Sequence, residues 1–279
     1  MSAVEHPIVV GVDGSDPSLD AVDWAVDAAA RHGHALRTVH GSLWNRYEAT
    51  TPSASVDRAA GDVMGHDIAS VAESRARARR DDVAVSCEVF ADDPVDVLVA
   101  ESDEASMVVV GNRGRGPLMG ALLGSTGLGV AARARCPVVV VRGAAANRGT
   151  RNGTVLLALD GTPQGLRAAQ FAFDDARTRG SDISAVHVRS PERAAPDGQE
   201  RDLLDEALAA ASGTSDVPVR LETLEDSPRH ALLAAADEAD LLVLGAHRRR
   251  SGVPGLQLGL LSHALLSTSP CPVAVVPEA

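Results

Sequence analysis

The sequence predicts an α/β chain of two tandem domains, each a five-stranded parallel sheet with helices on both faces. Short, continuous apolar runs alternate with helical stretches through all 279 residues. Landmarks of the first half also recur in the second half at a constant offset: Asp13 and Asp160 lie 147 residues apart, and so do His40 and His187. Continuous apolar runs are typical of strands buried on both faces, and strand–helix alternation favours parallel pairing through right-handed crossovers.

The elements of the first copy can be assigned in order from their residue patterns. The runs IVVGV, ALRTVHG, VAVSCEVF, SMVVVG and PVVVVR are rich in Val, so they predict strands. The first helix follows from Leu19, Val22 and Val26, which recur at helical spacing. The expected order is strand 8–12, helix 18–31, strand 35–41, helix 62–79, strand 83–90, helix 94–104, strand 106–111, helix 125–135 and strand 137–142.

The second copy begins after a stretch without periodicity. Residues 142–153, RGAAANRGTRNG, are rich in Gly, Ala, Asn and Arg and predict a linker. We therefore expect domain 1 over residues 1–146 and domain 2 over residues 147–279. Between its second strand and third helix the first copy has 13 more residues than the second, so we expect a longer loop at 41–61. A flap over a ligand, an interface and a disordered loop are all compatible with that segment.

Composition excludes several classes of function. The net charge is −12, which disfavours nucleic acid and anionic membranes as partners. All basic side chains are Arg, because the chain has no Lys, so it has neither a Walker A lysine nor a Schiff-base lysine. No apolar run approaches the roughly 18 residues of a membrane helix, and the first residues do not resemble a secretory signal. We expect a cytoplasmic protein.

Cysteines and histidines are interpreted as structural residues. Cys87, Cys136 and Cys271 are scattered and form no CxxC pair, which argues against a disulfide framework or a zinc site. Cys136 and Cys271 both precede an apolar run, as small buried residues do. His40 and His187 recur at matching strand ends, which indicates a shared structural role. We assign no catalytic residue and no metal ligand.

Two sets of charged residues lie on the first two predicted helices. Four aspartates share one face of the first helix, and four arginines gather at the end of the second. They are Asp16, Asp20, Asp23 and Asp27, and Arg75, Arg77, Arg79 and Arg80. We interpret the aspartates as a solvated face rather than a metal site. The arginines complement a helix C-terminus, which explains them better than nucleic-acid binding.

The residues that carry chemistry lie where strands 8–12 and 106–111 end. Parallel sheets bind ligands at the carboxyl ends of strands, where the strand order reverses. The strand 106–111 continues into GNRGRGPLMGALLGST, and a helix is predicted from Ser125. Glycine amides that turn inward, the free N–H groups of a helix start and the hydroxyls of Ser125 and Thr126 can all bind phosphate. In a chain without Lys, this is the expected polyphosphate site.

The spacing Gly111-x2-Gly114-x9-Gly124-Ser125 resembles the G-x2-G-x9-G-[ST] signature of the universal stress protein family. IVVGVDGSDPSLDAVDWA is similar to the family's first strand and helix, and CPVVVVR to its last strand. The resemblance covers both halves outside the linker and the 41–61 loop. It implies two tandem Rossmann-like domains of the adenine nucleotide alpha hydrolase-like type. It also implies the ATP-binding subgroup, with a regulatory role in the stress response.

The resemblance assigns nucleotide contacts in the first domain, with ATP as the ligand, with or without Mg²⁺. It places Asp13 at the nucleoside, the backbone of Gly41 at the adenine edge and the glycine loop at the phosphates. Thr126 departs from the family, which has an apolar residue there, and Arg113 and Arg115 either contact phosphate or are solvated. The expected binding residues are Gly11, Val12, Asp13, Gly41, Val110, Gly111, Asn112, Arg113, Gly114, Gly124, Ser125 and Thr126.

The second domain keeps only part of this set. Asp160, Val188 and Gly245 are its weaker candidates. Its loop reads GAHRRRSGVPGLQLGLLSH, in which Arg248 stands in place of the second glycine and Leu260 in place of the serine. A side chain at 248 disfavours a left-handed backbone, and Leu260 offers no hydroxyl. We expect this domain to bind ATP weakly or not at all.

Two other classes of function remain as alternatives. A slow ATPase or an adenylate-handling enzyme on the same fold would need a base and Mg²⁺ ligands near the γ-phosphate. The loop has no clear acidic pair, although Asp16 is close in sequence. A structural module would instead pair through the strands VVVVR and VAVVP. The expected assembly is a homodimer or a pseudo-symmetric pairing of the two domains.

Overall fold

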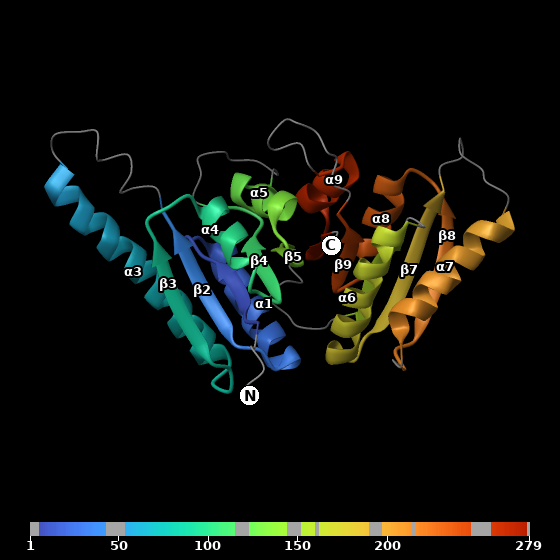
Figure 1. Ribbon diagram of the computed structural model, residues 1–279, viewed down its shortest axis with the longest axis horizontal. Helices are drawn as coiled ribbons and strands as arrows, with labels where there is room; N and C mark the ends of the chain where they lie inside the picture. The colour runs from blue at the N-terminus through green and yellow to red at the C-terminus, as the bar shows by residue number, and fades with distance from the viewer. Residues whose placement is uncertain are drawn as a thin grey trace. The chain divides into compact units, whose positions relative to one another are not determined.

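A computed structural model of the chain describes residues 6–42, 54–114, 123–143, 152–159, 162–189, 197–213, 216–246 and 258–277. Its contacts divide the chain into two compact units, Met1–Val141 and Arg142–Ala279. Each unit contains a parallel sheet with helices packed on it (Figure 1). The prediction of two tandem α/β domains is confirmed.

The sheet of the first unit has the strand order β3-β2-β1-β4-β5. All its strands are parallel, and Ile8 of β1 pairs with Leu36 of β2 and with Met107 of β4. The strand order reverses between β1 and β4, so their carboxyl ends lie side by side at the same edge. The strands are β1 (Ile8–Gly11), β2 (Leu36–Gly41), β3 (Val85–Phe90), β4 (Met107–Gly111) and β5 (Val138–Val141).

The helices of the first unit pack in two pairs. α1 packs against α3, and α4 packs against α5. The chain passes through α1 and α3 on the way to β3 and returns through α4 and α5, so right-handed crossovers place the two pairs on opposite faces. The helices are α1 (Asp16–His32), α3 (Ala54–Arg79), α4 (Pro94–Glu101) and α5 (Ser125–Arg133).

Local signals explain where α1 begins and ends. The Oγ of Ser15 accepts a hydrogen bond from the Ser18 N–H at 3.4 Å, which makes Ser15 the N-cap, and Pro17 lies in the first turn. Gly33 ends the helix with a left-handed φ of 70°, a conformation that glycine adopts without strain. The helix therefore starts two residues before the predicted Ser18, because its cap is Ser15.

The other helix boundaries also differ from the predicted ones. α3 begins at Ala54, well before the predicted Asp62, so part of the expected 41–61 loop is helical. The alanines of this segment favour a helix, but the second copy has no counterpart to reveal it. α4 ends at Glu101, where Ser102 turns its hydroxyl back to the Val99 carbonyl at 2.6 Å. α5 ends at Arg133, because the next residue is extended.

The second unit repeats this arrangement with the strand order β10-β9-β6-β7-β8, again all parallel. α6 packs against α7, and α8 against α9. Its strands are β6 (Thr154–Leu159), β7 (Asp182–Arg189), β8 (Val219–Glu225), β9 (Leu241–Gly245) and β10 (Val273–Val276). Its helices are α6 (Pro163–Arg179), α7 (Asp197–Ser212), α8 (Pro228–Ala236) and α9 (Leu260–Thr268).

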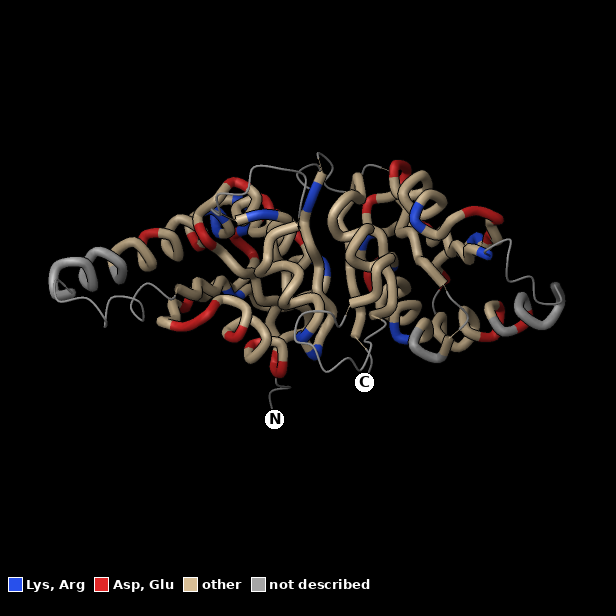
Figure 2. The backbone as a smooth tube through the Cα atoms, turned by 90° about the horizontal axis from the view of Figure 1, so that it is seen from above, with Lys and Arg blue, Asp and Glu red and all other residues tan. Residues whose placement is uncertain are grey.

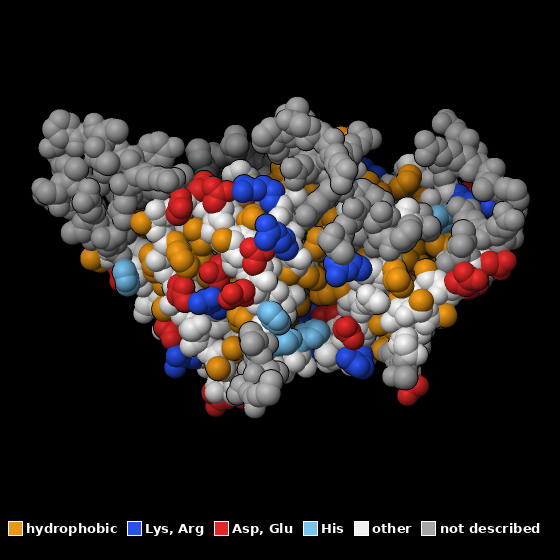
Figure 3. All heavy atoms as spheres, viewed as in Figure 1, with side chains coloured by type: hydrophobic (Ala, Val, Ile, Leu, Met, Phe, Trp, Pro, Cys, Tyr) orange, Lys and Arg blue, Asp and Glu red, His pale blue; other side chains and the backbone are white. Residues whose placement is uncertain are grey.

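Small aliphatic side chains fill both cores. β5 reads VVVV and β10 reads VAVV, and all eight residues are buried. The central strands β1, β4, β6 and β9 carry no charged residue, so the charges lie on the helices, the outer strands and the connecting turns (Figure 2). On the face seen in Figure 3, arginines lie among Asp and Glu side chains. No helix within the described ranges has the length and hydropathy of a membrane span.

Candidate functional site

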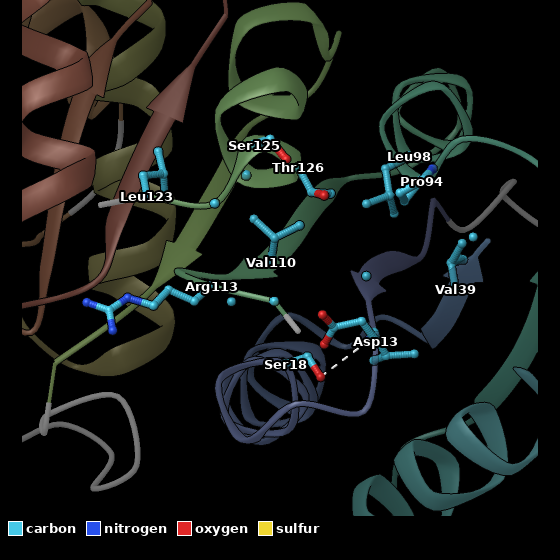
Figure 4. Close-up of a pocket in the computed structure, with 17 residues that line it drawn as sticks. Asp13, Ser18, Val39, Pro94, Leu98, Val110, Arg113, Leu123, Ser125 and Thr126 are labelled. Atoms are coloured by element: carbon cyan, nitrogen blue, oxygen red, sulfur yellow. Dashed lines mark hydrogen bonds between the residues drawn. The ribbon is translucent and has the colours of Figure 1, made fainter. Parts of the chain in front are cut away.

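A cavity of about 490 Å³ opens at the carboxyl ends of β1, β2 and β4 in the first unit (Figure 4). It lies at the point where the strand order reverses, and its volume is in the range of roughly 300–1,000 Å³ typical of small-molecule sites. The lining residues are Gly11, Val12, Asp13, Ser18, Val39, Gly41, Pro94, Leu98, Val110, Gly111, Arg113, Gly114, Leu123, Gly124, Ser125, Thr126 and Gly127.

All the residues expected to bind a ligand in this unit line the cavity, with the exception of Asn112. The Asn112 N–H donates to the carbonyl of Val141 at 3.0 Å, and its own carbonyl accepts from the Gly124 N–H at 2.9 Å. Asn112 therefore joins the start of the glycine loop to its end. Arg115 lies in the part of this loop outside the described residues.

The turn between β1 and α1 fixes the Asp13 carboxylate. Its Oδ1 accepts hydrogen bonds from the N–H of Ser15 at 3.0 Å and from the Oγ of Ser15 at 2.6 Å. Its Oδ2 faces Gly114, where a Cβ would overlap with it. In Figure 4 the carboxylate points into the cavity, across from Ser125 and Thr126. The cavity therefore contains one oriented acidic side chain at the end of β1.

Close approach explains the glycines around the cavity. A Cβ on Gly111 would lie 2.5 Å from the Pro17 carbonyl oxygen at the start of α1. A Cβ on Gly11 would lie 2.7 Å from Leu98 Cδ1, and one on Gly41 would lie 2.8 Å from the Cα of Pro94. Real Cβ atoms do not approach neighbours this closely. Glycine at these positions lets α1 and α4 approach the strand ends.

The start of α5 supplies hydrogen-bond donors. Gly124 is the N-cap and provides no side chain to accept from the first turn, which contains no acidic residue. The first N–H groups of a helix have no partner within the helix. Ser125, Thr126 and Gly127 lie in this turn and line the cavity. Together with the helix dipole, these groups favour an anion such as a phosphate.

Both halves of the chain match the model of the universal stress protein family, over residues 5–142 and 152–277. The chain belongs to this family. It is 32% identical to a universal stress protein of Mycobacterium tuberculosis over 290 residues, 97% of each chain. It is 33% identical to one of Mycolicibacterium smegmatis over 289 residues, which cover 99% of this chain and 98% of the relative.

A crystal structure of a universal stress protein from Archaeoglobus fulgidus is similar over the full length of both chains, with a TM-score of 0.74 and 19% sequence identity. At this identity the likeness concerns the fold. The family resemblance inferred from the glycine spacing, and the tandem arrangement of two universal stress protein domains, are confirmed.

The sequence interpretation of this universal stress protein missed six lining residues. Two could have been found from local signals, because Ser18 falls in the first turn of α1 and Pro94 follows the N-cap Asp93. The other four are apolar or small and depend on tertiary packing. The missed residues are Ser18, Val39, Pro94, Leu98, Leu123 and Gly127.

Arg113 lines the cavity, but its side chain is exposed and extends away from Asp13 in Figure 4. His40 is buried, and its Nδ1 donates to the Val12 carbonyl at 2.7 Å. In the second unit His187 makes the same contact with the Leu159 carbonyl at 3.0 Å. Each histidine thus holds the end of the first strand of its unit, in agreement with the structural role expected from their recurrence.

The second unit differs at the positions that correspond to the cavity. Ala158 and Val188 stand where the first unit has Gly11 and Gly41, and Gly245 ends β9. Leu260 begins α9 with 85% of its surface exposed, where the first unit has Ser125. Asp160 and the loop around Arg248 lie outside the described residues.

The cysteines are reduced and lie apart from the cavity lining. Burial raises the pKa of Cys136 to about 12 and that of Cys271 to about 11. Cys87 is exposed, and its pKa is also raised, by partial burial and by the neighbouring Glu73. Among the described residues, no group of three or more His, Cys, Asp or Glu side chains could hold a metal ion.

Proposed function

We propose that the first unit binds an adenine nucleotide, with ATP as the physiological ligand, and that the second unit binds it weakly or not at all. A single observation carries this proposal. One cavity joins an apolar slot, an oriented carboxylate and the start of a helix, in that spatial order along the strand ends. These three features suit the base, the sugar and the phosphates of a nucleotide.

The base is assigned to the apolar slot. Val39, Pro94 and Leu98 supply its walls, and Gly41 adds no side chain. Gly41 has no side chain and packs closely against Pro94. The polar atoms that the end of β2 offers to a base in this slot are therefore backbone groups. A planar heterocycle can stack between apolar walls and bond to backbone amides.

The ribose and phosphates are assigned to the polar side of the cavity. A carboxylate such as Asp13 accepts hydrogen bonds from ribose hydroxyls. Gly111, Gly114 and the first turn of α5 would hold the phosphates through N–H groups, with the hydroxyls of Ser125 and Thr126. Mg²⁺, when present, would be carried by the phosphates, because the carboxylate of Asp13 is turned to Ser15 and Gly114.

We further propose a regulatory role with little or no turnover, in which nucleotide occupancy reports the state of the cell. Rapid phosphoryl transfer needs a positioned base and metal ligands near the γ-phosphate. The acidic side chain on the described lining is Asp13, and we assign it to the ribose. Slow hydrolysis of ATP by the protein is the result that would revise this role.

The test is to denature freshly purified protein and to quantify the released nucleotide by chromatography. We expect one adenine nucleotide per chain, mostly ATP, and a loss of it in Asp13→Ala. Gly259→Ala is the matched control, because a Cβ there meets open space at the corresponding helix start of the second unit. Two equal tight sites per chain in calorimetry would contradict the assignment to the first unit.

The identity of the released nucleotide separates the two roles. Mostly ATP supports a binding protein, whereas mostly ADP, with steady phosphate release on added ATP, supports the slow ATPase. The absence of nucleotide, together with no thermal shift on added ATP, would overturn the proposal in favour of a structural module. Sedimentation of the same samples tests the expected homodimer.

A further inference from the structure

We propose that Ser15 is a positioning residue that gives this site its selectivity for ribose over deoxyribose, because it fixes the Asp13 carboxylate. This inference rests on the proposed nucleotide site and adds a specificity determinant to it. Ser15 itself does not line the cavity. Its effect would be exerted entirely through Asp13.

Hydrogen bonds link Asp13, Ser15 and Ser18 at the start of α1. Ser15 holds Oδ1 of Asp13 twice, through its N–H at 3.0 Å and its Oγ at 2.6 Å. Ser18 Oγ donates to the Ser15 carbonyl at 2.8 Å and accepts from the Asp13 N–H at 3.4 Å. Ser18 is only 3% exposed, so solvent does not compete strongly for this hydroxyl. The carboxylate is therefore tied to a helix start rather than to a flexible loop.

The contact with Ser15 fixes the orientation of the carboxylate, with one oxygen held and the other facing the cavity. With Oδ1 held against α1, the planar carboxylate must direct Oδ2 toward Gly114. Rotation about the Asp13 side chain would break the 2.6 Å bond to Ser15 Oγ. A short hydrogen bond to a charged acceptor is about twice as strong as a neutral one, so it holds the rotamer effectively.

A fixed acceptor discriminates between sugars better than a mobile one. A site built to accept a hydroxyl proton rejects an analogue that lacks the hydroxyl, because its polar group is then left without a partner. A mobile carboxylate can instead turn to solvent and avoid this penalty. Ser15 would therefore affect the preference for ribose much more than the binding of the base and phosphates.

The test uses ATP, 2′-deoxy-ATP and 3′-deoxy-ATP as titrants in calorimetry with the full chain. We expect the wild-type protein to bind at least one deoxy analogue about tenfold more weakly than ATP. Ser15→Ala should reduce this ratio to about threefold or less, chiefly because the deoxy analogue binds more tightly once the carboxylate can turn to solvent. Ser15→Thr keeps a hydroxyl at the N-cap and should restore the ratio.

Controls separate positioning from a loss of stability. Thr162 is the N-cap residue of α6 at the corresponding place in the second unit, but its side chain makes no cap hydrogen bond, so Thr162→Ala is a matched truncation without the loss of a cap. Ser15→Ala should lower the melting temperature of the free protein more than Thr162→Ala does, because only Ser15 makes a cap hydrogen bond, and only Ser15→Ala should change the sugar ratio. In an Asp13→Ala background, Ser15→Ala should have no further effect on the ratio, because the two residues act as one unit.

The outcomes distinguish this inference from the proposed function. If the wild-type protein binds no ATP, the nucleotide site and the inference both fail. If it binds ATP but does not discriminate between the sugars, or if Ser15→Ala keeps the full ratio, the role of Ser15 is overturned while the nucleotide site stands. An equal loss of affinity for all three titrants would show that Ser15 is only a structural cap.

Discussion

At Gly114 the space for a side chain is already occupied by a carboxylate. A Cβ there would overlap with Asp13 Oδ2. Gly114→Ala should therefore push the carboxylate out of its position and weaken ATP binding by about tenfold or more, the value of a charged hydrogen bond. Calorimetry with ATP measures this change. Folding of the free protein should be nearly unaffected, because the displaced side chain faces a cavity.

Gly259→Ala serves as the comparison for this substitution, since its Cβ would meet open space. Its ATP affinity should equal that of the wild-type protein. Equal affinity in Gly114→Ala would mean that Asp13 does not take part in binding.

The three cysteines should differ sharply in reactivity. With pKa values near 12 and 11, Cys136 and Cys271 remain protonated and buried at neutral pH, whereas Cys87 is exposed. A reagent that reacts with thiolates should modify one cysteine per native chain at pH 8, and all three after unfolding. Because its pKa is raised, Cys87 should react more slowly than a small free thiol and faster as the pH rises.

The same two buried thiols give stability a pH dependence. Their folded pKa values lie above the ordinary value of 9.0, so they stabilise the fold below pH 9 and this contribution is lost as the pH rises toward 11. In the modification experiment, reaction of all three cysteines of the native protein at the same rate would contradict the burial of Cys136 and Cys271.

At this scale the sequence indicated which residues surround the cavity but not why some of them are glycines. The spacing of Gly111, Gly114 and Gly124 identified the loop, and glycine was expected there partly for left-handed backbone. The described glycines with positive φ lie elsewhere, as at Gly14 and Gly33. Gly111 and Gly114 instead permit close approach by α1 and by Asp13, whereas a Cβ on Gly124 would make only ordinary contacts. Such distances between separate elements cannot be deduced from spacing along a chain.

Between α1 and α3 the two predicted charge clusters meet as ion pairs. Arg75 binds Asp23 through two hydrogen bonds, at 2.8 and 2.6 Å, and Arg79 binds Asp27 at 3.0 and 2.7 Å. The aspartate face is thus partly covered by α3 rather than solvated. The Asp23 side chain is only 10% exposed. The sequence revealed each cluster, but the pairing depends on how two helices pack.

Loss of Arg75 should destabilise the first unit. Arg75→Ala leaves the nearly buried Asp23 with only a distant partner, Arg79 at 3.7 Å. We expect the free energy of unfolding to fall by about 1–2 kcal/mol, the cost of a charged hydrogen bond at a partly buried site. Urea denaturation measures this change.

Arg80→Ala is the matched control on the same helix end. Arg80 pairs with Asp82 at 2.8 Å, but both side chains are largely exposed. Loss of Arg80 should leave the free energy of unfolding unchanged, because exposed ion pairs contribute little to stability. If both variants unfold like the wild-type protein, the ion pairs do not fasten α3 to α1.

Across the whole molecule, ATP should protect one unit and leave the other unchanged. A ligand at 100 times its Kd stabilises the unit that binds it by about 2.7 kcal/mol. Hydrogen exchange with mass spectrometry should therefore slow on ATP addition at the turn 13–18 and the loop 111–126, but not at 245–262. Protection of equal size in both regions would contradict a single working site.

The overall fold was predictable because each half repeats one simple pattern. Strands buried on both faces appear as continuous apolar runs, and the same pattern recurs in the second copy, at one offset up to His40 and at a shorter one from Pro94 on. Prediction failed at the start of α3, where the copies differ in length. No sequence pattern indicated that Leu98 and Val39 line the cavity, because they reach it only through packing and strand register.

The histidine contacts at the first strands have a consequence for the history of the chain. His40 bonds to the Val12 carbonyl and His187 to the Leu159 carbonyl, and His40 does not line the cavity. The scaffold of each repeat is therefore secured separately from its cavity. After a duplication, one copy could accumulate Ala158, Val188 and Leu260 at its strand and helix ends and still fold. Under the proposed function, selection on binding would then act on the first copy, and folding alone would constrain the second.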